Sequence, residues 1–170
     1  YNANKASNWY TSNLTMESSV ADDADHVCFP SASGSGNVFS QITVQGGVYG
    51  IRLRGDLRAC VWNSVYSENV VTPISLGGAS VVSYGHTFVG CILAGPLASH
   101  PQYAQRIACI HLANARHCQF TNIWFDAVSG TPPTLWAVWM NSAINCGFEG
   151  GKTKLGLSPL TETIVRSVAS

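Results

Sequence analysis

One hydrophobic pattern recurs along the chain: an aromatic residue, two further residues, and then a smaller apolar residue. The aromatic positions follow one another at similar but unequal intervals. A period of about 20 to 30 residues is typical of stacked structural repeats, because each repeat buries its apolar side only against its neighbours. The pattern occurs at Phe39–Ile42, Trp62–Val65, Phe88–Cys91 and Phe120–Ile123, and in a weaker form at Phe148–Gly151.

A second pattern, two apolar residues separated by one other residue, lies between these positions. It begins at the same distance from the aromatic residue in the first two repeats, and clearly later in the next two. The additional residues fall in 95–105 and 129–134, two stretches that contain proline and therefore predict inserted loops. The second pattern occurs at Ile51–Leu53, Ile74–Leu76, Ile110–Leu112 and Val138–Met140.

Small or polar residues at fixed positions predict sharp corners in the backbone. Glycine and asparagine tolerate the left-handed conformation that such corners require. One set lies two residues after each aromatic position: Gln41, Ser64, Gly90, Asn122 and Gly150. Another set follows the second pattern: Arg54–Gly55, Gly77–Gly78, Ala113–Asn114 and Asn141–Ser142.

Short runs of Val, Ile, Thr and aromatic residues between Gly, Asn and Ser favour β-strands, and helical periodicity is nearly absent. We therefore expect an all-β fold with two or three short strands per repeat. This arrangement resembles the single-stranded right-handed parallel β-helix of the pectate-lyase-like superfamily, with about five rungs. An antiparallel sandwich is the alternative, but independent strands would not keep two patterns in phase across four repeats.

The resemblance covers residues 38–151, which we expect to form the β-helix. Residues 1–37 are expected to form an irregular N-terminal segment, in which Tyr10–Leu14 and Val27–Phe29 are candidates for one extra rung. Residues 152–170 are expected to form a C-terminal tail or cap. Because the chain begins at Tyr1 rather than at methionine, we expect it to be processed or to belong to a longer protein.

Equal positions in successive repeats should stack about 4.8 Å apart, the strand spacing of a β-sheet, so the aromatic residues form one inward column. Two positions earlier lies a cysteine and histidine column, which suggests zinc. Those side chains would spread over about 14 Å, whereas zinc ligands lie within about 2.3 Å of the metal. We therefore expect buried thiols, no metal and no cofactor, although Cys118 and Cys146 are close enough to pair if oxidised. The column is Asn37, Cys60, His86, Cys118 and Cys146.

The charge content narrows the possible partners. Hydrophobic residues are 46% of the chain and charged residues only 11%, with a net charge of zero. A nucleic-acid partner is disfavoured, because binding phosphates needs an excess of Lys and Arg. No apolar run approaches the length of a membrane-spanning helix, so no membrane insertion is expected.

Two outward columns carry large apolar side chains, and Trp136 lies near them in the sequence. Exposed apolar residues on a weakly charged protein are typical of an interface, which favours a homotrimer. The alternative is that the inserted loops or residues 155–170 fold back over them. The first column is Thr43, Tyr66, Ile92 and Trp124, and the second is Arg52, Ser75, His111 and Trp139.

The superfamily contains pectate lyases, polygalacturonases and trimeric phage tailspikes. The polygalacturonase signature is not met, since Asp22–Asp23 lies outside the main repeat and Gly85–His86 is followed by Thr87. The polar turns and free cysteines are more similar to a phage tailspike or tail-fibre coil. That resemblance implies a virion, extracellular location after assembly in the host cytoplasm. It also implies contacts with other virion tail proteins and with host-surface polysaccharide.

Two carboxylates are candidates for catalysis. Glu68 and Asp126 share one position of the repeat, two rungs or about 10 Å apart, with the small Ala94 between them. Side-chain reach brings this close to the separation of about 6.5 to 9.5 Å used by inverting glycosidases. The alternative is that both are ordinary solvated residues.

Three tryptophans, Trp124, Trp136 and Trp139, are candidates for stacking on sugar rings. Three classes of function therefore stay open. The chain is a non-enzymatic polysaccharide-binding module of a virion appendage, a depolymerase of the same kind, or a secreted polysaccharide lyase or hydrolase.

Overall fold

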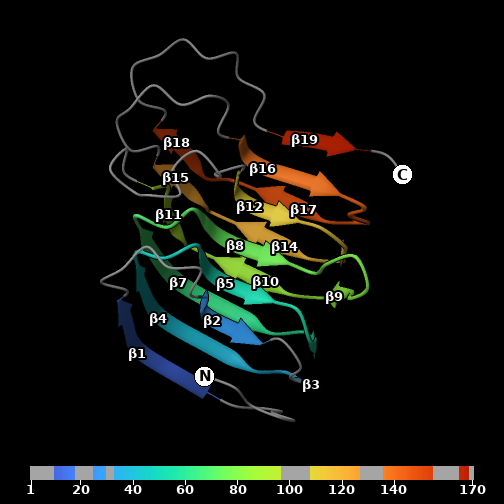
Figure 1. Cartoon of the computed structure of the whole chain (residues 1–170), viewed down its shortest axis with the longest axis horizontal. Helices are drawn as coiled ribbons and strands as arrows, with labels where there is room; N and C mark the ends of the chain where they lie inside the picture. The colour runs from blue at the N-terminus through green and yellow to red at the C-terminus, as the bar shows by residue number, and fades with distance from the viewer. Residues whose placement is uncertain are drawn as a thin grey trace.

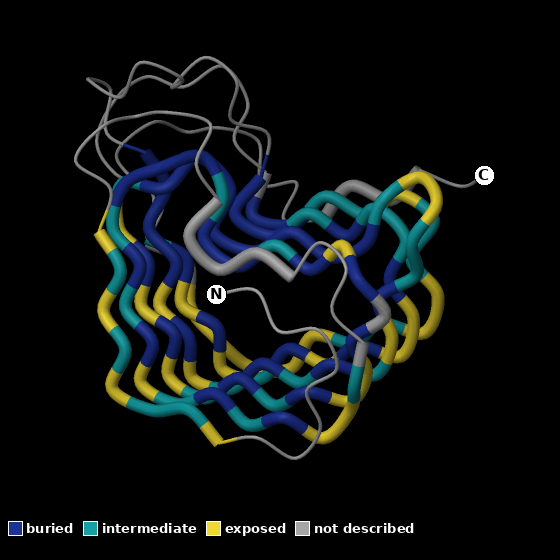
Figure 2. The backbone as a smooth tube through the Cα atoms, turned by 60° about the horizontal axis from the view of Figure 1, so that its bottom comes forward, coloured by how far each residue is buried: buried dark blue, intermediate teal, exposed yellow. Residues whose placement is uncertain are grey.

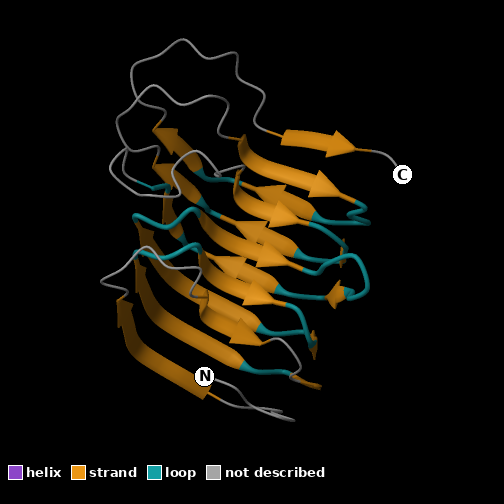
Figure 3. Cartoon of the chain, in the orientation of Figure 1, coloured by secondary structure: helices purple, strands orange, loops and turns teal. Residues whose placement is uncertain are grey.

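The computed structural model describes residues 10–17, 25–29, 33–96, 108–126, 136–154 and 165–168. All regular structure within these ranges is β-strand, and no helix occurs in them (Figure 3). No membrane-spanning helix is therefore present in the described part of the chain. The all-β prediction is confirmed.

The strands form three sheets, here called sheets A, B and C, and each strand pair in the described residues is parallel. Sheet A contains β1 (Tyr10–Glu17), β4 (Val38–Gln45), β7 (Val61–Glu68), β10 (Thr87–Val89), β11 (Ile92–Ala94), β14 (Gln119–Thr121), β15 (Trp124–Asp126), β17 (Gly147–Glu149) and β18 (Lys152–Lys154). Sheet B contains β2 (Asp25–Phe29), β5 (Tyr49–Leu53), β8 (Thr72–Leu76), β12 (Ala108–Leu112), β16 (Trp136–Asn141) and β19 (Val165–Val168). Sheet C contains β3 (Ser33–Ser35), β6 (Asp56–Arg58), β9 (Ser83–Tyr84) and β13 (Ala115–Arg116).

The chain visits the three sheets in a fixed order. It passes from A to B to C and returns to A, where the new strand pairs with the strand of the previous pass (Figure 1). In the last described pass β16 of sheet B is followed by β17 of sheet A, and an isolated bridge between Arg116 and Ile144 takes the place of a sheet C strand. The same segments of successive repeats consequently lie over one another (Figure 2). The stacking also extends beyond residues 38–151, because β1 pairs with β4 and β18 pairs with β15.

The inward aromatic column lies where the sequence predicts it. In sheet A, Phe39, Trp62, Phe88, Phe120 and Phe148 are direct register partners. Successive ring centroids are 4.0, 5.7, 5.1 and 4.6 Å apart, with interplanar angles of at most 10°. The first four rings are buried, whereas the last is 37% exposed at the end of the column.

The corner that follows each aromatic residue is left-handed, as predicted. Its φ angles are 55° at Gln41, 56° at Ser64, 61° at Gly90, 53° at Asn122 and 64° at Gly150. In the later repeats this corner divides the sheet A strand in two, so that β7 pairs with both β10 and β11. The corners after the second pattern are less regular, with positive φ at Gly77 and Ser142 but not at Arg54–Gly55 or Ala113–Asn114.

A further left-handed column was not predicted. It lies between sheet C and the next strand of sheet A, and it includes alanine and histidine, which are not turn signals. Its members are Gly36, Ala59, Gly85, His117 and Asn145.

Candidate functional site

The outer face of sheet A carries the first predicted outward column. Thr43 pairs with Tyr66, Tyr66 with Ile92, and Ile92 with Trp124. Tyr66, Ile92 and Trp124 are 37%, 40% and 40% exposed, so three large side chains in consecutive passes face outwards. The column ends at Lys152, whose Nζ lies 5.7 Å from the centroid of the Trp124 ring.

The second outward column lies in sheet B and differs from the prediction. Its register is as expected, because Arg52, Ser75, His111 and Trp139 are successive partners. However, Ser75 is only 5% exposed, every residue of β8 is buried, and Trp139 is half-buried. The expectation of an exposed apolar stripe on this sheet is therefore wrong, because register determines where a side chain points but not what covers it. Burial also lowers the pKa of the His111 imidazole.

The two candidate carboxylates lie on the outer face of sheet A beside the exposed column. The Glu68 carboxylate accepts hydrogen bonds from the Tyr66 hydroxyl and the Gln45 amide, both at 3.2 Å. Ala94 and Asp126 are register partners in the next two passes. Partial desolvation raises the pKa of Tyr66, and the negative charges of Glu68 and then of Asp126 raise it further. Both carboxylates therefore contribute to the raised pKa of Tyr66.

The three candidate tryptophans do not share one sheet. Trp124 belongs to β15 in sheet A, whereas Trp136 and Trp139 belong to β16 in sheet B. The Trp136 side chain lies outside the described residues. Trp124, together with Tyr66, is thus the aromatic group placed beside the carboxylates.

The cysteine and histidine column is buried except at its last member, Cys146, which is half-buried. Cys60 and Cys118 each direct their Sγ to the backbone oxygen two residues earlier, both at 3.5 Å. Between them, His86 Nδ1 accepts a hydrogen bond from the backbone N–H of Cys60 at 3.4 Å, and desolvation lowers the pKa of His86 to about 4. No group of three His, Cys, Asp or Glu side chains suited to a metal ion occurs in the described ranges.

Cys118 and Cys146 lie on neighbouring passes, as the sequence predicts. The backbone N–H of Gly147 donates to the Cys118 oxygen at 2.9 Å, which holds the two cysteine segments side by side. The hydrogen bond between the two thiols raises the pKa of Cys118 and lowers that of Cys146. Both are free thiols in this structure.

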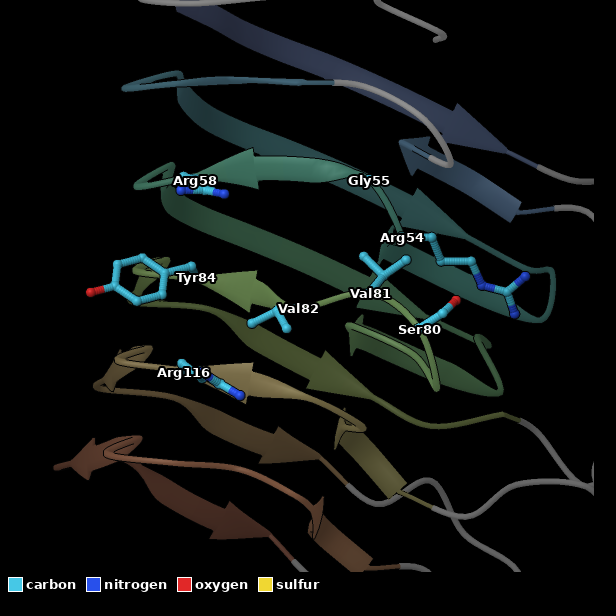
Figure 4. Close-up of a pocket in the computed structure, with 8 residues that line it drawn as sticks. All are labelled: Arg54, Gly55, Arg58, Ser80, Val81, Val82, Tyr84 and Arg116. Carbon is cyan, nitrogen blue, oxygen red and sulfur yellow. The ribbon is translucent and has the colours of Figure 1, made fainter.

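A pocket beside sheet C was not anticipated from the sequence. It has a volume of about 490 Å³, and its lining includes Arg54, Arg58, Arg116, Tyr84 and Val82 (Figure 4). Arg58, Tyr84 and Arg116 are register partners on β6, β9 and β13. They lie two positions before the cysteine and histidine column, so a search of that repeat position would have found them.

Comparison with known proteins gives no match. No family model fits the chain, and neither a curated protein nor a solved structure shows significant similarity to it.

Proposed function

We propose that the chain is a right-handed parallel β-helix that serves as a polysaccharide-binding module of a virion appendage, similar to a phage tailspike or tail fibre. The observation that carries this proposal is the exposed column of Tyr66, Ile92 and Trp124 beside Glu68 and Asp126. The fixed A–B–C order of parallel strands supports the β-helix part of the proposal.

The chemistry of this face suits an extended glycan. Flat apolar side chains pack against the C–H faces of sugar rings, while carboxylates and hydroxyls bond to sugar hydroxyl groups. Because the column repeats about every 4.8 Å along the stack, it offers a linear series of contacts to a linear polymer. Glu68 is already oriented by two neutral donors, Tyr66 and Gln45, so less side-chain freedom is lost on binding.

We further propose that three copies assemble into a homotrimer. Only 11% of the residues are charged, and the described surface exposes several large apolar side chains, among them Tyr10 and Phe148. Such a surface favours association over dispersion as single chains. Sedimentation equilibrium should give a mass three times 18.1 kDa, and a monomer at micromolar concentration would overturn the trimer.

Depolymerase activity is the second candidate function, and it depends on Glu68 and Asp126. In an inverting hydrolysis one carboxylic acid protonates the leaving glycosidic oxygen, while the other carboxylate takes a proton from the attacking water. The two residues occupy one face, two strand spacings or about 10 Å apart between backbones, with Ala94 in the intervening pass.

The binding proposal is tested with a panel of purified bacterial capsular polysaccharides and lipopolysaccharide O-chains. The wild-type chain should bind at least one of them, and Tyr66→Ala should weaken that binding about tenfold. Ile144→Ala is the matched control, because it removes a side chain that is 47% exposed outside sheet A. Equal effects of the two variants would contradict the site. Release of reducing ends would separate a depolymerase from a binding module.

A further inference from the structure

We infer that the pocket beside sheet C binds the carboxylate of an acidic sugar such as a uronic acid. This goes beyond the proposed function, because the pocket uses sheet C residues and none from the outer face of sheet A. A uronic acid is one sugar ring with one carboxylate, and the lining offers a partner for each part.

The charged part of the pocket is cationic. Among the described residues, its lining includes three arginines and no carboxylate. Arg58 and Arg116 are exposed and lie on either side of Tyr84 on neighbouring strands, whereas Arg54 lies at the other end of the pocket, beyond Val81 (Figure 4). A guanidinium keeps its charge at all physiological pH values and presents a planar pair of donors that matches a carboxylate.

The spacing of Arg58 and Arg116 suits a single ligand. Both pair with Tyr84, so their backbones are two strand spacings apart, or about 10 Å. Two long arginine side chains can close that separation around one anionic group placed over β9. Because both arginines lie on strands with fixed register, the strand pairing fixes their backbone positions.

The rest of the lining suits the sugar ring rather than a bare inorganic ion. Tyr84 is 44% exposed, and Val81 and Val82 lie between it and Arg54 (Figure 4). An aromatic face and two aliphatic side chains give apolar contact to a ring, which phosphate or acetate lacks. A volume of about 490 Å³ is also within the ordinary range for small organic ligands and exceeds the needs of a single ion.

The test is a titration of the wild-type chain with glucuronate, followed through the NMR signals of the arginine Nε–H groups. Glucuronate should shift the signals of Arg58 and Arg116, and glucose should not. Removing one charged partner should weaken binding at least about tenfold, so Arg116→Gln is the main variant. Lys152→Gln is the matched control, because it removes the same charge from the exposed end of the sheet A column. It should leave glucuronate binding unchanged.

Several results would overturn the inference. One is the absence of glucuronate-induced shifts at Arg58 and Arg116, and another is equal weakening by Arg116→Gln and Lys152→Gln, which would indicate a general charge effect. Inorganic phosphate or acetate binding as tightly as glucuronate would reject the sugar contact. Tyr84→Ala should weaken glucuronate but not acetate, and an unchanged glucuronate affinity would also reject it. Polysaccharide binding that depends on Tyr66 is unaffected by any of these outcomes, so the two proposals fail separately.

Discussion

The two sides of sheet A carry columns of residues with the same repeat but different chemistry. The inner column keeps one chemical type, with Phe39, Trp62, Phe88 and Phe120 stacked in parallel and buried. The outer column changes from threonine through tyrosine, isoleucine and tryptophan to lysine, and its large members are about 40% exposed. The buried aromatic column is therefore uniform, whereas on the outer face stacking fixes only the position of each residue. Tyr66, Ile92 and Trp124 are exposed there and can provide contacts for a partner.

The largest expected effect is on the inner column. Phe120→Ala should reduce the free energy of unfolding by about 3–5 kcal/mol, because it leaves a cavity between two stacked rings that cannot collapse. Phe120 is 1% exposed, with ring neighbours at 5.1 and 4.6 Å. Phe148→Ala is the matched control at the exposed end of the same column, and urea denaturation should show a clearly smaller loss. Similar losses in both variants would contradict the buried column.

The buried histidine makes the inner side sensitive to acid. Desolvation lowers the pKa of His86 from 6.5 to about 4, so the unfolded chain binds a proton more readily than the folded chain. The stability linked to this group is complete above pH 6.5 and is lost as the pH falls towards 4, by about 3 kcal/mol at 1.4 kcal/mol per pKa unit. His86→Gln should remove this part of the acid sensitivity in denaturation measured at pH 7 and pH 4.5. If His86→Gln kept the full acid dependence of the unfolding free energy, burial of His86 would not be the cause of that dependence.

The carboxylates on the outer side should affect activity without affecting stability. If the chain cleaves a polysaccharide, Glu68→Gln and Asp126→Asn should each lower the turnover about a hundredfold, because each removes a proton donor or acceptor. The thermal midpoint should change little, since Glu68 is exposed and Asp126 is half-buried. Reducing-end assays check the turnover, and retained activity in both variants would remove the pair from the catalytic site.

The smallest expected effect on stability, with a measurable effect on binding, is at Trp124. Trp124→Ala should change the free energy of unfolding by less than about 1 kcal/mol, because the side chain is exposed and its Lys152 contact is a weak surface interaction. Polysaccharide affinity should nevertheless fall about tenfold. A loss of stability comparable to that of Phe120→Ala would show that Trp124 belongs to the packed interior.

The sequence predicts the inner column and its corners because both depend on backbone register alone. Phe88 and Phe120 are separated by the longest interval between successive aromatic positions and still stack, since the additional residues fall outside the strands. The outer faces are less predictable. Ser75 and Tyr66 both occupy outward positions of the repeat, yet one is buried and the other exposed, so the repeat position alone does not determine exposure.

The arginine pocket shows a second limit of sequence analysis. Arg58 and Arg116 occupy one repeat position, but Arg54 does not, and Tyr84 stands between the two arginines in that column. A search for chemically uniform columns misses such a mixed set. Trp124 and Trp139 show the converse case. They are the same residue type, but they occupy different repeat positions and therefore lie on different sheets.

The most direct test of the functional contrast between the two sides is hydroxyl-radical footprinting of the wild-type chain with and without a polysaccharide that it binds. Aromatic side chains report their own accessibility in this measurement. We predict that the polysaccharide protects Tyr66 and Trp124 on the outer face of sheet A. Tyr10, which is 69% exposed on β1 at the edge of that sheet, and buried Phe88 should remain unchanged. A bound polysaccharide that leaves Tyr66 and Trp124 unprotected would contradict binding at the outer face of sheet A.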